Sequence, residues 1–158
     1  MIETYEEALK RVKSDGYVLR FVPKELKTAE LCKIAVEIIS RALAFVPEDL
    51  KTTKLCKIAV KGGGYALEFV PEELRTAVLC KLAVEDFGCN LEYVPKKLKT
   101  AELCELAVEK GGWALQYVPE NLKTAELCKL AVENDSDALE FVPKKFNTTK
   151  WYKKVTTL

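Results

Sequence analysis

Prolines recur at a fixed interval along this 158-residue chain. They are Pro23, Pro47, Pro71, Pro95, Pro119 and Pro143, and every successive spacing is 24 residues. A sequence period of about 20–50 residues is typical of tandem-repeat proteins, in which each unit buries its apolar face only against its neighbours. The chain is therefore expected to repeat one small structural unit along its length.

One repeat predicts two short helices separated by a turn. In the repeat that begins at Gly64, segment 66–70 has apolar residues at helical spacing, and Pro71 ends this first helix because proline cannot continue the hydrogen-bond pattern. Segment 71–74 predicts a tight turn, and Thr76 is expected to cap a second helix that is apolar over most of its circumference. The equivalent caps are Thr28, Thr52, Thr100, Thr124 and Thr148. Glycines are expected to make the bend into the next repeat, because they tolerate positive φ. They are Gly62, Gly63, Gly64, Gly88, Gly111 and Gly112.

Both ends of the chain depart from the repeat in a way that is typical of caps. Thr4 aligns with the capping threonines, and Thr4-x-x-Glu7 has the pattern of a capping box. We expect an N-terminal cap over residues 1–14, repeats over 15–146 and a C-terminal cap over 147–158. The fold class that follows is an all-α, right-handed solenoid of five to six two-helix repeats, forming a single domain over residues 1–158.

The repeated pattern Ala-Leu-x-Phe/Tyr-Val-Pro…Leu-Lys-Thr-x-x-Leu-Cys-x-x-Ala-Val resembles the short bacterial helical repeats grouped as a domain of unknown function. It is also similar in period to leucine-rich variant repeats. The resemblance covers roughly residues 15–150, and it implies a right-handed superhelix of paired short helices and no activity. Leucine-rich variant proteins can carry a cysteine-ligated cluster ahead of their repeats, but no cysteine precedes Cys32 here, so no cofactor is expected.

Composition excludes several classes of function. The chain has no histidine, which removes imidazole-based catalysis and histidine-ligated metal sites, and we expect no enzyme activity. A net charge of +1 gives no general field that would gather a nucleic acid or an anionic membrane. The N-terminal segment does not have the pattern of a signal peptide, and no apolar run is long enough to span a membrane. We therefore expect a monomeric protein with reduced thiols, in the cytoplasm of a bacterium or of an infected host cell.

Five cysteines repeat with the same 24-residue spacing. This cysteine column consists of Cys32, Cys56, Cys80, Cys104 and Cys128. Equivalent helices of neighbouring repeats are expected to lie ~8–10 Å apart. Such a spacing is too wide for a disulfide, or for zinc, whose thiolate ligands lie ~2.3 Å from the metal. The column predicts small packed side chains and no metal site. Cys89 lies outside the column, where it is expected to be accessible to oxidation.

Two sets of lysines are candidate surface features. Lys33–Glu37, Lys81–Glu85 and Lys129–Glu133 are spaced as ion pairs on one helix face. A second set precedes the capping threonines and has less obvious partners. This basic column consists of Lys27, Lys51, Arg75, Lys99 and Lys123. It provides an alternative hypothesis, in which the repeats bind nucleic acid through the basic column.

The most informative positions vary from repeat to repeat while their neighbours stay nearly constant. They lie six residues before each proline, at Tyr17, Arg41, Tyr65, Cys89, Trp113 and Asp137, and three residues further on, at Arg20, Ala44, Glu68, Glu92, Gln116 and Glu140. We call this set the variable ridge. Tyr, Trp and Arg are enriched at binding hot spots, so the leading hypothesis is a module that binds another protein through the ridge, one version being an inhibitor that occludes a larger enzyme. Alternatives are drift of exposed positions with the aromatics covering the bends, and an engineered repeat scaffold.

Overall fold

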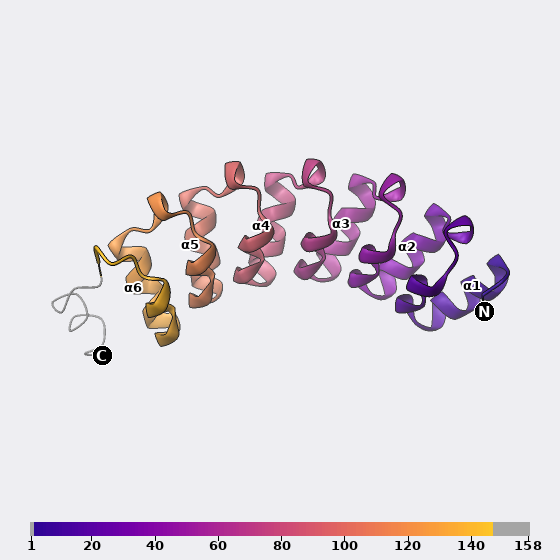
Figure 1. Cartoon of the computed structure of the whole chain (residues 1–158), viewed down its shortest axis with the longest axis horizontal. Helices are drawn as coiled ribbons and strands as arrows, with labels where there is room; N and C mark the ends of the chain where they lie inside the picture. The colour runs from indigo at the N-terminus through magenta and orange to yellow at the C-terminus, as the bar shows by residue number, and fades with distance from the viewer. Residues whose placement is uncertain (1, 147–158) are drawn as a thin grey trace. The chain divides into compact units, whose positions relative to one another are not determined.

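The fold of the chain is all-helical over residues 2–146, which are the residues that this computed structural model describes. Helices of ten residues alternate with tighter 3₁₀ helices, and no strand occurs in the described range. Figure 1 shows this alternation along the chain. The predicted pair of helices in each repeat is confirmed, and the C-terminal cap predicted over residues 147–158 lies outside the described residues.

Each repeat contains three helical elements. The α-helices are α1 (Tyr5–Ser14), α2 (Ala29–Ile38), α3 (Thr53–Gly62), α4 (Ala77–Asp86), α5 (Ala101–Lys110) and α6 (Ala125–Asn134). The six-residue 3₁₀ helices are η1 (Gly16–Phe21), η3 (Ser40–Phe45), η5 (Gly64–Phe69), η7 (Gly88–Tyr93), η9 (Gly112–Tyr117) and η11 (Ser136–Phe141). Single-turn 3₁₀ elements after the prolines are η2 (Lys24–Leu26), η4 (Glu48–Leu50), η6 (Glu72–Leu74), η8 (Lys96–Leu98) and η10 (Glu120–Leu122).

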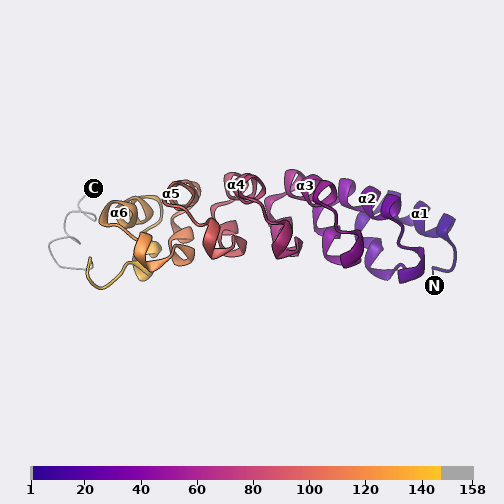
Figure 2. The ribbon, with the colours of Figure 1, turned by 90° about the horizontal axis from the view of Figure 1, so that it is seen from above.

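The chain divides into two compact units at a boundary inside α4, the first ending at Ala83 and the second beginning at Val84. Within each unit the α-helices form one layer and the six-residue 3₁₀ helices form the other, as the view from above shows (Figure 2). Three of the six-residue 3₁₀ helices pack against the α-helices on either side of them in the sequence: η1 contacts α1 and α2, η3 contacts α2 and α3, and η9 contacts α5 and α6. Neighbouring repeats within a unit therefore share one core.

Threonine capping is confirmed wherever the structure describes the cap. The Thr28 hydroxyl accepts a hydrogen bond from the Leu31 amide at 3.2 Å, and the same contact recurs at Thr52, Thr76, Thr100 and Thr124. Each bond satisfies one amide that the first helical turn leaves unpaired. At Thr4 the expected capping box is modified: Thr4 accepts from the Glu7 amide, but the Glu7 carboxylate accepts from the Glu3 amide, one residue before the cap.

The core of each unit forms from one face of the α-helices and the inner face of the 3₁₀ helices. In α2 the buried residues are Leu31, Cys32, Ala35 and Val36, and the same four positions are buried in α3 and α5. The 3₁₀ helices contribute a leucine that is fully buried in five of them: Leu19, Leu43, Leu67, Leu91 and Leu115. Packing of small and branched residues at these fixed positions explains why the repeats keep them nearly constant.

The expected role of the glycines is wrong in its physical cause. No glycine of the described range lies in the left-handed region, with φ between about +20° and +160°; Gly63 and Gly111 are extended, with φ of 177° and 175°. Gly16 is needed for close approach instead, because a Cβ there would lie 2.5 Å from the carbonyl oxygen of Ala35 in α2. A Cβ on Gly112 would clash in the same way with the Ala131 carbonyl. The absence of a side chain lets the 3₁₀ helix approach the next α-helix of its unit.

Candidate functional site

The variable ridge lies on the outer face of the six-residue 3₁₀ helices. Residues three apart in a 3₁₀ helix eclipse each other, so both ridge positions of a helix face the same direction. Among the predicted partner-binding residues, Arg20, Arg41, Tyr65, Glu68, Trp113 and Asp137 are exposed, and Tyr17 and Gln116 are half-buried. Tyr65 and Trp113 retain 47% and 41% of their surface, so two large aromatic side chains are available on the ridge.

In the first unit, aromatic rings and guanidinium groups lie against each other along the ridge. The Arg20 guanidinium lies 4.8 Å from the centre of the Phe21 ring and 5.9 Å from that of Phe45. Tyr17 also contacts Phe45, with their ring centres 6.2 Å apart. Arg41 stands 5.9 Å from the centre of the Tyr65 ring in the following repeat. Side chains of successive repeats thus form one surface in this unit.

Sequence reasoning missed Phe21 and Phe45 as part of this surface. Neither residue was among the predicted ridge positions, yet Phe21 is 65% exposed and the half-buried Phe45 contacts Tyr17 and Arg20. The available signal was their column: an aromatic residue stands two positions before every proline. In a six-residue 3₁₀ helix that position lies beside the ridge, because the tighter turn places it away from the leucine that fills the core.

In the second unit, the ridge combines an aromatic wall with carboxylates. The rings of Trp113 and Phe141 meet edge to face, with centres 5.5 Å apart, and the Gln116 side chain donates to the Trp113 carbonyl at 3.1 Å. Trp113 borders an open pocket of about 510 Å³, which Asp137 and Glu140 also line. The half-buried position of Tyr117, on η9, raises the pKa of its hydroxyl, and the nearby Glu92 carboxylate adds to the shift.

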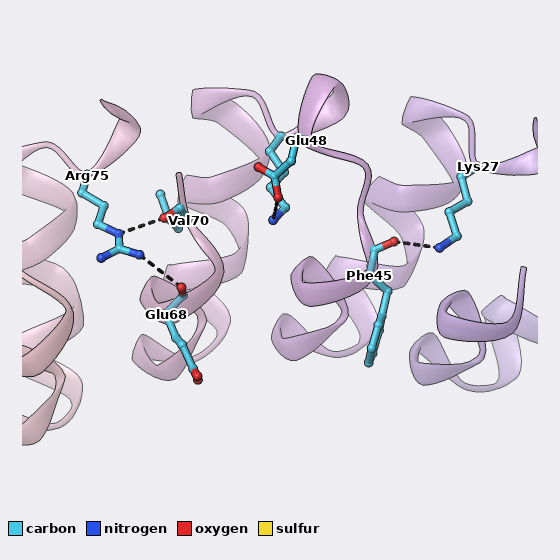
Figure 3. Close-up of polar contacts among 7 residues, drawn as sticks. Lys27, Phe45, Glu48, Glu68, Val70 and Arg75 are labelled. Carbon is cyan, nitrogen blue, oxygen red and sulfur yellow. Dashed lines mark hydrogen bonds and ion pairs between the residues drawn. The ribbon is translucent and has the colours of Figure 1, made fainter. Parts of the chain in front are cut away.

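The basic column has internal partners, contrary to the expectation from the sequence. Lys27, Lys99 and Lys123 each donate from Nζ to the carbonyl 18 residues further on, at Phe45, Tyr117 and Phe141, over 2.9, 2.9 and 3.1 Å. These carbonyls belong to the last residues of the 3₁₀ helices η3, η9 and η11. An ammonium at this end of a helix satisfies a carbonyl that has no partner within the helix and complements its dipole. Figure 3 shows the Lys27 contact.

Lys51 and Arg75 use different acceptors. Lys51 pairs with Glu48 at 2.6 Å, and only 7% of the Lys51 side chain is exposed. Arg75 folds back within its own repeat and donates to the carbonyls of Val70 and Glu68, at 2.8 and 3.1 Å (Figure 3). Burial lowers the pKa of Lys99, with smaller opposing effects from Cys104 and Glu92. Lys27, Lys99 and Lys123 therefore connect successive repeats, whereas Lys51 and Arg75 use their donors within their own repeat.

The cysteine column is buried, as predicted. All five of its side chains have no exposed surface, and burial raises the pKa of Cys80, Cys104 and Cys128 to about 11. Such thiols stay protonated near neutral pH and are poor nucleophiles. Cys89 is half-buried, and its pKa is raised too, mainly by burial and to a smaller extent by the nearby Glu92 carboxylate. Within residues 2–146 no cluster of three or more metal-ligating side chains forms.

The expected ion pairs on α2 and α6 form between partly exposed side chains. Lys33 and Glu37 lie 3.5 Å apart on α2, and Lys129 and Glu133 lie 3.3 Å apart on α6. Exposed pairs of this kind contribute little to stability, about 0.3–0.5 kcal/mol each. They give the outer face of the α-helices a balanced charge. None of the described helices is long and apolar enough to cross a membrane.

These features define a class of protein: tandem repeats of an α-helix and a 3₁₀ helix that present a variable set of exposed side chains. The model of a family described as Domain of unknown function (DUF4116) matches residues 6–51, 28–75, 79–123 and 101–147. These overlapping segments include most of the chain, so the chain belongs to this family. The expected resemblance to short helical repeats of a domain of unknown function is thereby confirmed. A search of curated proteins gives no match.

Proposed function

We propose that the chain is a non-enzymatic module that binds another protein through the variable ridge. In this proposal the helix pairs continue as one right-handed α-solenoid of five to six repeats, acting as a monomer in the cytoplasm of a bacterium or of an infected host cell. One specific form of the function is inhibition, in which the ridge occludes a larger enzyme. A repeat scaffold suits this role because it holds many independent surface positions in fixed geometry.

The observation that carries the proposal is the contrast between the ridge and its surroundings. Leu67 and Ala66, between the two ridge positions of η5, have no exposed surface, whereas Tyr65 is 47% exposed. A partner that covers an exposed aromatic ring gains the free energy of removing it from water, and Tyr, Trp and Arg are the residues that most often anchor protein interfaces. The ridge presents all three types on a rigid base.

The alternative of nucleic-acid binding loses its main support. It requires the basic column to present its charges to phosphates, but Lys27, Lys99 and Lys123 donate to main-chain carbonyls within the protein. An enzyme is disfavoured by two observations: the chain has no histidine, and its buried thiols have raised pKa values. A catalytic cysteine requires a lowered pKa, so the shift has the wrong direction for catalysis.

Affinity capture from cell lysate, compared between wild type and a ridge variant, tests the proposal. The variant Tyr65→Ala/Trp113→Ala removes the two exposed aromatic anchors, and Tyr17 is left in place because its ring packs on Phe45. Each buried anchor typically contributes about 2 kcal/mol or more, so the variant should lose the captured protein almost completely. The matched control is Val78→Ala, which trims an apolar side chain that is 75% exposed but lies off the ridge. Equal capture by all three proteins would refute the proposal.

A further inference from the structure

The arginines of the chain are distributed very unevenly. There are four, Arg11, Arg20, Arg41 and Arg75, and all lie in the first compact unit, whereas lysines occur throughout the chain. Arg11 pairs with Glu7 at 3.3 Å, and Arg75 donates to main-chain carbonyls. Arg20 and Arg41 have neither kind of contact within the described residues; Arg20 lies near the rings of Phe21 and Phe45, and Arg41 lies near the ring of Tyr65.

A contact between a guanidinium and an aromatic ring uses none of its N–H groups in a hydrogen bond. The planar group can therefore still donate two parallel hydrogen bonds to a carboxylate. The ring contacts also hold the long side chain in place, which reduces the entropy lost on binding. Lysine cannot provide this planar fork, and the first unit has arginine on the ridge, whereas lysine predominates elsewhere in the chain.

We infer that the ridge of the first unit binds an acidic segment of a partner protein. The carboxylates of that segment accept hydrogen bonds from Arg20 and Arg41, and an apolar side chain beside them covers Phe21, which is 65% exposed, and Tyr65. This inference rests on the proposed function and names the chemistry of the partner. The surface combines two positive charges with the exposed aromatic rings of Phe21 and Tyr65, a combination that is common at interface hot spots.

An acidic protein segment suits this surface better than a nucleic acid does. The ridge of the first unit carries two cations and one carboxylate, Glu68, which would face the phosphate backbone unfavourably. Nucleic-acid sites generally need many phosphate contacts and a clear basic excess. A short segment with a few carboxylates needs only the two guanidinium groups.

Selection of peptides from a random phage-displayed library on the immobilised full chain tests the inference. Enriched peptides should have an excess of Asp and Glu, and a synthetic copy of the most enriched one should bind the chain in fluorescence anisotropy. Arg20→Gln and Arg41→Gln should each weaken that peptide by about tenfold or more, as loss of a charge-assisted hydrogen bond does. Arg20→Lys/Arg41→Lys keeps the charge and should still lose most of the affinity. Arg11→Gln is the matched control off the ridge and should bind as wild type.

Several results would overturn the inference. In the selection, these are no enrichment at all or enrichment of peptides without an excess of Asp and Glu. In the binding assay, they are full affinity of a Gln or Lys variant that circular dichroism shows to be folded, or tighter binding of a single-stranded oligo-dT than of the peptide. Failure of the proposed function is distinguishable. If a captured protein depends on Tyr65 and Trp113 but the selected peptides are not acidic, only the inference fails; if neither experiment finds ridge-dependent binding, both fail.

Discussion

Replacing Lys99 by methionine tests whether the basic column stabilises the fold. Methionine keeps the apolar stem but removes the ammonium, so the Tyr117 carbonyl loses the donor that lies 2.9 Å away. A hydrogen bond from a charged donor contributes about 1.5–3 kcal/mol. Methionine also avoids the desolvation cost of the partly buried ammonium, a cost that the lowered pKa of Lys99 reflects, and this offsets part of the loss. We expect a net loss of about 1–2 kcal/mol in the free energy of unfolding, which for a chain of this size lowers Tm by about 2–8 °C.

The matched control is Lys129→Met in the same unit. The Lys129 side chain is 41% exposed and pairs with Glu133 on its own helix, so its loss should lower the free energy of unfolding by about 0.3–0.5 kcal/mol. Urea unfolding of both variants, followed by circular dichroism at 222 nm, measures the difference. If Lys99→Met unfolds at the same urea concentration as Lys129→Met, the column does not stabilise the fold and its lysines are again candidates for an external partner.

Three further predictions concern the scaffold. Cys104→Ala should reduce the loss of stability at alkaline pH. Burial raises the folded-state pKa of Cys104 to about 11, so the stabilisation present below pH 9 is lost as the pH rises toward 11, by about 1.4 kcal/mol per pH unit for each such thiol. Urea unfolding measured between about pH 9 and 11 checks this, and an equal fall of unfolding free energy with pH in variant and wild type would contradict it. Gly112→Ala should destabilise by about 1–3 kcal/mol through its clash with Ala131, whereas Gly111→Ala, with open space around its Cβ, should be neutral, and equal melting temperatures would contradict this. Deletion of residues 72–95, one full period, should leave a folded and shorter protein by circular dichroism; complete unfolding would show that distant repeats depend on one another.

Local features of the fold were predictable because each has a direct signal in the sequence. The proline spacing defines the repeat, Thr100 has the chemistry of a cap, and Cys104 stands among apolar residues at helical spacing. The exposed positions of the ridge were also predicted, since they change between repeats while buried neighbours do not. These signals depend on side-chain chemistry within one repeat.

Contacts between repeats were not predictable in the same way. The acceptor of Lys99 is a main-chain carbonyl, a group that every residue possesses, so no sequence pattern identifies Tyr117 as the partner. The role of Gly112 depends on how closely two helices approach, and a preference for positive φ was the wrong explanation. The contact between Arg20 and Phe45 depends on the arrangement of side chains in two successive repeats.

Three of the five contacts of the basic column, those of Lys27, Lys99 and Lys123, run forward along the chain. Lys27 and Lys99 each depend on a carbonyl that is synthesised 18 residues later, whereas nothing in those carbonyls requires the lysine to be present before them. While the chain emerges from a ribosome, the newest repeat therefore holds an ammonium without its acceptor, and it becomes fully stable only when its successor has folded. Truncation after such a lysine removes its acceptor and leaves a partly buried ammonium without a hydrogen-bond partner. Truncation before the acceptor carbonyl removes the lysine instead, and water can then donate to that carbonyl. Shortened chains should accordingly tolerate losses from their beginning better than losses from their end.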